Sequence, residues 1–154
     1  MAVYFFDSSA IVKGYLNETG TSWVINIIDP ASHSNIYLAR ITLVEVVSAI
    51  TRKARGTGLS TTGAAKAIAD FRQDFMQEYA LVEQTPLLIE QAAALAEAHV
   101  LRANDAIQLA AAIYVNAERL SLGLSEILLV SSDAELNAAA VIEGLVVDDP
   151  NAHP

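Results

Sequence analysis

Short runs of apolar residues without polar alternation recur along the chain. Residues 3–6 read Val-Tyr-Phe-Phe, and residues 127–130 read Ile-Leu-Leu-Val. Runs of this length that are rich in β-branched and aromatic residues are typical of strands buried on both faces. Three weaker runs lie at residues 35–38, 81–83 and 145–147. The pattern therefore predicts five short strands.

Segments with the helical spacing of apolar residues separate these strands. Their ends carry the usual helix signals, such as a capping Thr85 before Pro86 and the stop at Asp29-Pro30. A loop is predicted at residues 55–59, where two glycines follow a helix. The predicted helices cover residues 10–16, 21–28, 43–55, 60–79, 86–99, a segment from 104 through 113, and a short stretch after 133.

Alternation of strands and helices favours parallel pairing, because parallel strands need a crossover that is usually a helix. The predicted fold class is therefore α/β, a three-layer α/β/α sandwich around a central, mostly parallel sheet. The length of 154 residues suits one compact unit. We expect a single domain over residues 1–150 and a C-terminal tail over residues 151–154.

Composition narrows the possible chemistry. The chain has no cysteine, which excludes disulfide scaffolds, zinc ribbons and thiol catalysis. Its formal net charge of −9 argues against binding nucleic acid by bulk charge alone. The N-terminal residues lack the basic region of a targeting segment, and the alanine-rich stretches fall short of a membrane span. We expect a soluble, cytoplasmic protein.

Four acidic residues are predicted to meet at one edge of the sheet. Asp7 follows the first strand and Asp133 follows the fourth, while Glu45 and Asp105 fall in the first turns of helices. In open parallel sheets, ligands bind outside the carboxyl ends of the strands, near the point where strand order reverses. Asp7 is the most informative of the four, since an acid directly after three aromatic residues is partly desolvated and needs donors or a cation.

A purely structural interpretation competes with this one at every position. Acidic residues are common at strand-to-helix junctions, as N-caps and as partners of the helix dipole. Thr42 and Glu45 have the spacing of a capping box, and Asn104 could cap the helix that contains Asp105. A capping role is also the favoured interpretation of the Ser9 hydroxyl, with support of a metal ligand as the alternative.

If the four carboxylates share one pocket, their mutual repulsion favours a divalent cation. A cluster of oxygen ligands without histidine or cysteine indicates Mg²⁺ or Mn²⁺ rather than zinc. The three histidines, His33, His99 and His153, are expected in ordinary surface or helix-end roles. A bound ion would lower the pKa of its water and position that water for in-line attack on a phosphodiester; the number of ions is left open.

These residues stand in motifs that resemble PIN domains and, more narrowly, VapC-type toxin ribonucleases. The resemblance runs in order from Val3 to Pro150. Its motifs are residues 6–13 with 18–20, residues 45–52, residues 104–110, and the Ser131-Ser132-Asp133 corner. Two positions depart from the family pattern: Gln108 stands where relatives often have His, and Ser131 stands where Thr is common.

The resemblance implies an endoribonuclease that depends on Mg²⁺ or Mn²⁺. Its metal-binding and catalytic acids would match Asp7, Glu45 and Asp105, with Asp133 as a more variable fourth. It also implies an RNA substrate and a cognate antitoxin whose tail occupies the active-site groove, and a homodimer is left open. The alternative is a catalytically degenerate PIN-like domain that binds metal and a protein or RNA partner without cleavage.

RNA binding would need a local positive cluster, and the densest is formed by Arg52, Lys53 and Arg55, with Arg40 and Arg102 as neighbours. These side chains could contact phosphates, or they could only interact favourably with the helix dipole at the C-terminal end of their helix. A haloacid-dehalogenase-like phosphatase needs a second Asp where Ser9 stands, and a receiver-like domain lacks its acidic pair and late lysine. Both alternatives are therefore disfavoured.

Overall fold

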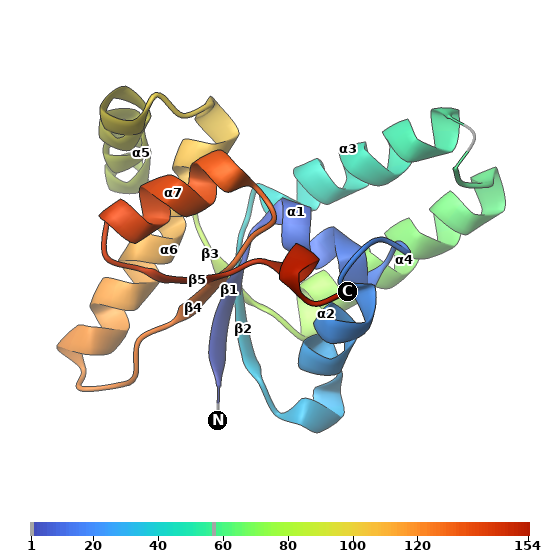
Figure 1. Cartoon of the computed structure of the whole chain (residues 1–154), viewed down its shortest axis with the longest axis horizontal. Helices are drawn as coiled ribbons and strands as arrows, with labels where there is room; N and C mark the ends of the chain where they lie inside the picture. Colours follow the sequence, from blue (N-terminus) through green and yellow to red (C-terminus); the bar gives the residue numbers. More distant parts are fainter. Residues whose placement is uncertain (1, 57) are drawn as a thin grey trace.

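A computed structural model describes residues 2–56 and 58–154, so Thr57, in the predicted loop at 55–59, lies outside the described residues (Figure 1). Strands and helices alternate along the chain, as predicted. The elements are β1 (Val3–Phe6), α1 (Ser8–Ile11), α2 (Thr21–Ile28), β2 (Asn35–Ala39), α3 (Thr42–Arg55), α4 (Thr61–Gln77), β3 (Ala80–Val82), α5 (Pro86–His99), α6 (Ala103–Ser121), β4 (Leu128–Val130), α7 (Ala134–Ile142) and β5 (Val146–Asp148), with three short 3₁₀ helices, η1 (Val12–Gly14), η2 (Pro30–Ser32) and η3 (Pro150–Ala152).

The five strands form one sheet in the order β3-β2-β1-β4-β5, and all four pairings are parallel. The chain adds β2 and β3 on one side of β1 and then crosses to add β4 and β5 on the other. Strand order therefore reverses between β1 and β4, and the crevice beyond their carboxyl ends is the usual ligand position in such sheets.

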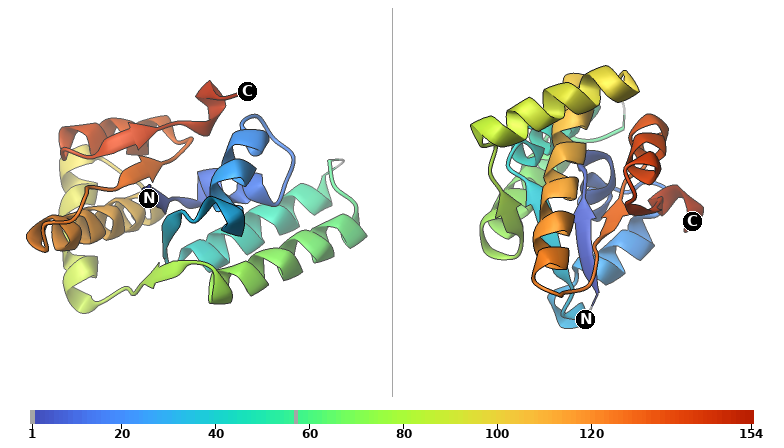
Figure 2. Two further views of the ribbon diagram at one scale, coloured as in Figure 1. Left: turned by 90° about the horizontal axis from the view of Figure 1, so that it is seen from below. Right: turned by 90° about the vertical axis from the view of Figure 1, so that its left-hand side faces the viewer.

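Helices cover both faces of the sheet, which confirms the predicted three-layer architecture (Figures 1 and 2). Alternate residues of β1 enter different cores: Phe5 packs with α5, α6 and α7, whereas Phe6 packs with α1, α2, α3 and α4. Both side chains are completely buried. Burial on both faces explains why the strands read as continuous apolar runs rather than as an alternating pattern. Within the described residues, every helix is too short or too polar to span a bilayer.

The first helix differs from its prediction at residues 10–16. It begins at Ser8, because the Asp7 carboxylate accepts a hydrogen bond from the Ala10 backbone N–H and caps it, and after Ile11 the chain continues as the 3₁₀ helix η1. Predicted strand bounds at β3, β4 and β5 differ from the observed ones by a single residue at one or both ends.

Residues 150–153, which include most of the expected tail, pack against α2 and η1. The His153 ring stacks on Trp23 with centroids 4.2 Å apart, and its Nε2 lies 2.8 Å from a carboxylate oxygen of Asp148. The buried Lys13 ammonium donates to the Asn151 side-chain oxygen at 3.2 Å. Gly20, at φ +87°, lies so close to Pro150 that an added Cβ would be 2.2 Å from its carbonyl oxygen.

Replacing Gly20 with alanine is expected to destabilise the protein by both backbone strain and this clash. Gly123 provides the matched control, because its φ is +70° and an added Cβ would meet nothing within 4 Å. Gly123→Ala should lower the free energy of unfolding by about 1 kcal/mol, the cost of a left-handed backbone, and Gly20→Ala by at least about 2 kcal/mol more. Urea denaturation measures both values. Equal losses would contradict the close packing of the chain end against Gly20.

Candidate active site

Asp7 lies at the end of the central strand and is only 3% exposed. Both of its carboxylate oxygens accept hydrogen bonds: Oδ1 from the Ala10 N–H at 3.0 Å and the Ser9 hydroxyl at 2.7 Å, and Oδ2 from the Ser131 hydroxyl at 2.9 Å. Burial raises the pKa of Asp7 to about 7, although these donors oppose the shift. The nearby Glu45 raises this pKa further.

Glu45 enters the site from the first turn of α3 and is held by two side chains from other elements. Its carboxylate accepts from the Gln108 amide at 2.7 Å and from the Ser8 hydroxyl at 3.2 Å. Burial raises the pKa of Glu45, and the two donors oppose the shift. The capping-box interpretation is wrong: Ile41 is the N-cap of α3 and makes no side-chain cap, and the Thr42 hydroxyl accepts from Gln108 instead.

Asp105 and Asp133 face a common cation, the guanidinium of Arg102. Its Nε lies 3.3 Å from Oδ2 of Asp105, and its Nη2 lies 3.4 Å from Oδ2 of Asp133. Burial and the charge of Asp133 raise the pKa of Asp105, and Arg102 opposes the shift. Asp133 also caps α7 by accepting from the Leu136 N–H. Asn104 is not the cap of α6, since the N-cap is Arg102.

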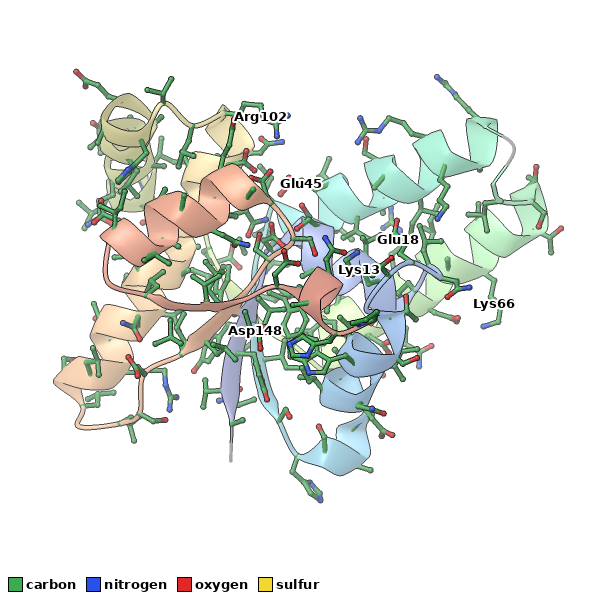
Figure 3. All side chains as sticks on the ribbon, viewed as in Figure 1. Lys13, Glu18, Glu45, Lys66, Arg102 and Asp148 are labelled. Carbon is green, nitrogen blue, oxygen red and sulfur yellow. The ribbon has the colours of Figure 1, made fainter. Side chains whose placement is uncertain are left out.

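The four predicted acids line a single cleft of about 470 Å³ at the carboxyl edge of β1 and β4. Figure 3 shows Glu45 and Arg102 on this side of the sheet. Capping and convergence are therefore not exclusive, because Asp7 and Asp133 cap helices and still face the cleft. The residues that line it are Asp7, Ser8, Ser9, Glu45, Arg52, Arg102, Ala103, Asn104, Asp105 and Asp133.

Neutral side chains that support the acids come from distant parts of the chain. The capping role that the sequence favours for Ser9 is wrong. Its hydroxyl lies within hydrogen-bond distance of both carboxylate oxygens of Asp7, to which it donates, and it accepts from the Ser132 N–H at 2.9 Å. Ser131 and Gln108, which stand out in sequence only as departures from the PIN pattern, each donate to one of the acids. Sequence alone did not indicate that Ser8 contacts Glu45.

Of the predicted basic cluster of Arg52, Lys53 and Arg55, one side chain lines the cleft and two do not. Arg52 lines it, whereas Lys53 lies 3.7 Å from a carboxylate oxygen of Glu18, and Arg55 is exposed at the end of α3. Arg40 is an ion-pair partner of Glu83 beside β3, so it is directed away from the acids. Only Arg52 and Arg102 bring positive charge to the cleft wall among the residues that the structure describes.

His33 is exposed and His99 ends α5, as expected, whereas His153 is partly buried in a contact with another element. His99, at the end of α5, lies 2.7 Å from a carboxylate oxygen of Glu143, and His153 stacks on Trp23. His33 adopts a positive φ at the end of η2. The cleft therefore offers oxygen ligands without histidine, within the described part of the chain.

This donor set fits a hard divalent cation in kind, because carboxylate oxygens suit Mg²⁺ and Mn²⁺. The acids do not converge on one point, however: no three His, Cys, Asp or Glu side chains within residues 2–56 and 58–154 are placed to hold a metal ion as they stand. The expectation of a tight cluster is thus only partly met. Arg102 contacts both Asp105 and Asp133, and the oxygens of Asp7 accept hydrogen bonds from neutral donors.

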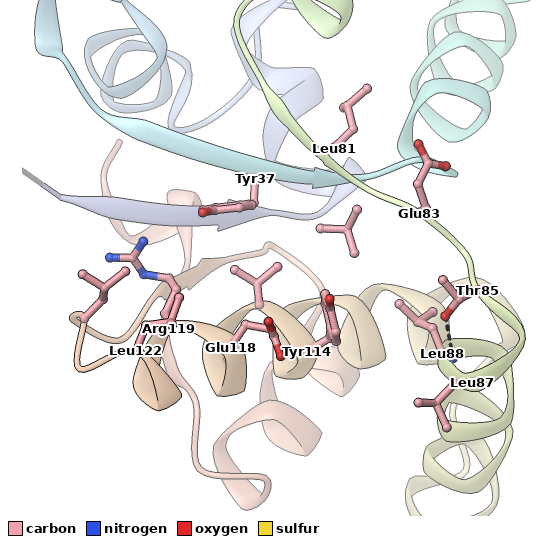
Figure 4. Close-up of a pocket in the computed structure, with 13 residues that line it drawn as sticks. Tyr37, Leu81, Glu83, Thr85, Leu87, Leu88, Tyr114, Glu118, Arg119 and Leu122 are labelled. Carbon is pink, nitrogen blue, oxygen red and sulfur yellow. Dashed lines mark hydrogen bonds between the residues drawn. The ribbon is translucent and has the colours of Figure 1, made fainter.

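A larger groove of about 730 Å³ lies elsewhere, between the edge strand β3 and helix α6 (Figure 4). Tyr37 and Leu81 border it on the sheet, Tyr114 borders it on α6, and Leu122 borders it just beyond the end of α6. Its charged lining residues, Glu83, Glu118 and Arg119, do not form an acidic cluster. The smaller, polar cleft is therefore the candidate site, because the four acids line it.

The burial of Asp7 predicts an unusual dependence of stability on pH. Its pKa is 3.8 as a free side chain and about 7 in the folded protein, so the folded state holds the proton more tightly. The free energy of unfolding should fall as pH rises from about 4 to 7, by on the order of 4 kcal/mol, since one pKa unit corresponds to about 1.4 kcal/mol. Asp7→Asn cannot ionise and should give a flatter profile, with higher stability than wild type above pH 7.

Urea denaturation across pH 4.5–8 in a metal chelator measures this difference. Asp70→Asn serves as the control, because Asp70 is an exposed acid that pairs with Lys66 outside the cleft. The control should retain the wild-type slope. Parallel profiles for wild type and Asp7→Asn would contradict the buried, ionisable state of Asp7.

Comparison with known proteins places this chain in a family. Residues 4–142 match the model of the PIN domain. The chain is 35% identical over 115 residues to ribonuclease VapC45 of Mycobacterium tuberculosis, covering 75% of this chain and 78% of that protein. The structure is similar to that of PAE2754 from Pyrobaculum aerophilum, with a TM-score of 0.65, 19% identity and coverage of 99% and 86%.

A second similar structure is VapBC2 from Rickettsia felis bound to a DNA fragment from their promoter, with a TM-score of 0.61 and 15% identity. Coverage there is 96% of this chain and 98% of that one. These structural likenesses support the fold, and the family match and the VapC45 identity extend over most of the chain. The protein therefore belongs to the PIN domain family.

Proposed function

We propose that this protein is an endoribonuclease that depends on Mg²⁺ or Mn²⁺ and acts as the toxin of a toxin–antitoxin pair. One observation carries the proposal: Asp7, Glu45, Asp105 and Asp133, from four separate segments of the chain, line one cleft at the carboxyl edge of a parallel sheet. The family match and the ribonuclease name of the relative support the same reaction class.

Asp7, Glu45 and Asp105 would hold the ion, with Asp133 as a fourth ligand or a ligand of its water. A bound divalent ion supplies an activated water for attack on a phosphodiester and neutralises charge on the phosphate oxygens. The protein's own contribution is orientation. Ser9 and Ser131 fix the rotamer of Asp7, and Gln108 and Ser8 fix that of Glu45, so the carboxylates face the cleft before RNA arrives.

Electrostatics of the cleft support the metal requirement. Burial raises the pKa values of Asp7, Glu45 and Asp105, which means that the ionised carboxylates are costly without a cation. A divalent ion removes this cost by pairing with the ionised forms. Metal binding should consequently stabilise the fold, because the ligands are assembled only in the native state.

An acidic protein must approach a polyanion through local positive charge. Arg52 lines the cleft and is suited to contact an RNA phosphate near the acids. Lys53 and Arg55 follow it on α3 and would extend this contact along the RNA backbone. These contacts are few, so the dependence of RNA affinity on salt should be shallow, because its slope is proportional to the number of phosphates contacted.

A protein partner follows from the same surface. The similar VapBC2 structure was solved with both proteins of its pair. We propose a cognate antitoxin whose segment enters the cleft with a basic side chain, because four acids against Arg52 and Arg102 leave the cleft wall negative. Self-association into a homodimer stays a prediction that light scattering can test.

Cleavage of a mixed RNA pool tests the proposed reaction. Wild type should cleave with Mg²⁺ or Mn²⁺ and stop with chelator, while Asp7→Asn and Asp105→Asn should each lose about 100-fold or more, because each removes a charged ligand. Asp70→Asn should cleave like wild type. Equal cleavage by all four proteins would expose a contaminating nuclease and contradict the proposal. Binding of Mn²⁺ and RNA by wild type without cleavage would favour the degenerate domain instead.

Gln108 gives a test of the support of Glu45 that needs no RNA. Gln108→Leu removes the buried donor to Glu45 and Thr42 while preserving the side-chain volume approximately. Loss of such a supporting hydrogen bond should weaken Mn²⁺ binding about tenfold or more. Calorimetric titration with Mn²⁺ measures the change, and the exposed Gln73→Leu is the control. Gln108→His restores a donor and should recover part of the affinity; wild-type binding by Gln108→Leu would contradict the role.

A further inference from the structure

The acids in the two halves of the cleft are stabilised by different kinds of donor. Asp7 and Glu45 receive hydrogen bonds from hydroxyls, an amide and a backbone N–H, all of them uncharged donors. Asp105 and Asp133 instead face the guanidinium of Arg102, within 3.3 and 3.4 Å. A full positive charge of the chain itself thus occupies the position between two of the four acids.

We propose that Arg102 is an internal cation that holds Asp105 and Asp133 in the metal-free protein, and that a divalent ion binds by displacing its guanidinium, which is then free to contact an RNA phosphate. This inference rests on the proposed function and gives Arg102 a role in metal binding beside the four acids. The guanidinium contacts one carboxylate oxygen of Asp105 and one of Asp133.

Displacement is feasible because the side chain is held loosely. Arg102 is 75% exposed, whereas Asp105 and Asp133 are 15% and 21% exposed. Ion pairs of such exposed arginines are weak and carry the cost of lost side-chain freedom, so a divalent ion with several carboxylate ligands can replace the guanidinium. The competition should weaken metal binding several-fold without preventing it.

The displaced guanidinium cannot leave the site. Arg102 is the N-cap of α6, three residues before Asp105, and its backbone remains fixed when its side chain swings out. Arginine presents a planar fork that matches the oxygens of a phosphate. Release by metal therefore places an unpaired guanidinium at the mouth of the cleft only when the ion is present, which links RNA contact to metal occupancy.

Arg52 offers a matched control because it lines the same cleft with the same charge. In the described residues, no ion pair joins Arg52 to an acid, so removing it eliminates a neighbouring charge without removing a competitor. The difference between the two substitutions isolates displacement from general electrostatic repulsion of the metal.

The experiment is a calorimetric titration of the RNA-free protein with Mn²⁺ alone. Arg102→Gln should bind Mn²⁺ about three- to tenfold more tightly than wild type, as expected for the loss of two exposed ion pairs, and Arg52→Gln should differ from wild type by less than about twofold. Arg102→Lys keeps the charge without the fork and should fall between wild type and Arg102→Gln. Urea denaturation confirms that each variant is folded.

A spectroscopic signature complements the affinities. In protein labelled with ¹⁵N-arginine, the Nε–H signal of Arg102, assigned by its loss in Arg102→Gln, should shift on addition of Mg²⁺, while that of Arg52 should move less. Equal affinity gains for Arg102→Gln and Arg52→Gln, weaker binding by Arg102→Gln, or an Arg102 signal insensitive to Mg²⁺ would each overturn the inference.

These outcomes separate the inference from the proposed function. If wild type binds Mn²⁺ and cleaves RNA while Arg102→Gln binds the ion no better, the ribonuclease stands and the role of Arg102 is wrong. If wild type binds no Mn²⁺ at millimolar concentration, both are overturned.

Discussion

The arrangement of the site depends on one carboxylate that is almost excluded from water at the end of the central strand. Asp7 follows β1 where β1 lies between its two neighbours, so the sheet itself buries it. A buried charged group needs partners, and Ser9, Ser131 and the Ala10 N–H supply them from α1 and from the segment after β4. The same contacts tie the first and fourth strands together at the point where strand order reverses.

Much of the framework could be predicted from sequence because it depends on local patterns. Apolar runs identified the strands, and the position of each acid relative to a strand or helix start identified the cleft. Contacts between distant segments could not be predicted, such as the bonds of Gln108 to Thr42 and Glu45. The capping-box assignment failed for the same reason: the spacing of Thr42 and Glu45 allows a local bond, but a partner 63 residues away holds Glu45 instead.

Two effects act in opposite directions on the ionised acids of the cleft: hydrogen bonds stabilise them and burial destabilises them. Neutral donors keep Asp7 and Glu45 in place, yet burial makes the ionised forms of these acids costly and raises their pKa values. Buried carboxylates whose charge is not compensated by a cation interact more favourably with an added cation than carboxylates that are already paired. Arg102 pairs with the acids of only one half of the cleft, Asp105 and Asp133, whereas Asp7 and Glu45 contact uncharged donors.

The stacking of His153 on Trp23 has a practical consequence. Trp23 is the one tryptophan of the chain, and the imidazole lies parallel to its indole ring at 4.2 Å. Tryptophan fluorescence, excited selectively over the five tyrosines, therefore reports a single place in the molecule, the contact between η3 and α2, and not the acidic cleft. Emission changes on adding a ligand would signal movement of the chain end, which makes this indole a built-in optical probe of whether residues 150–153 stay seated.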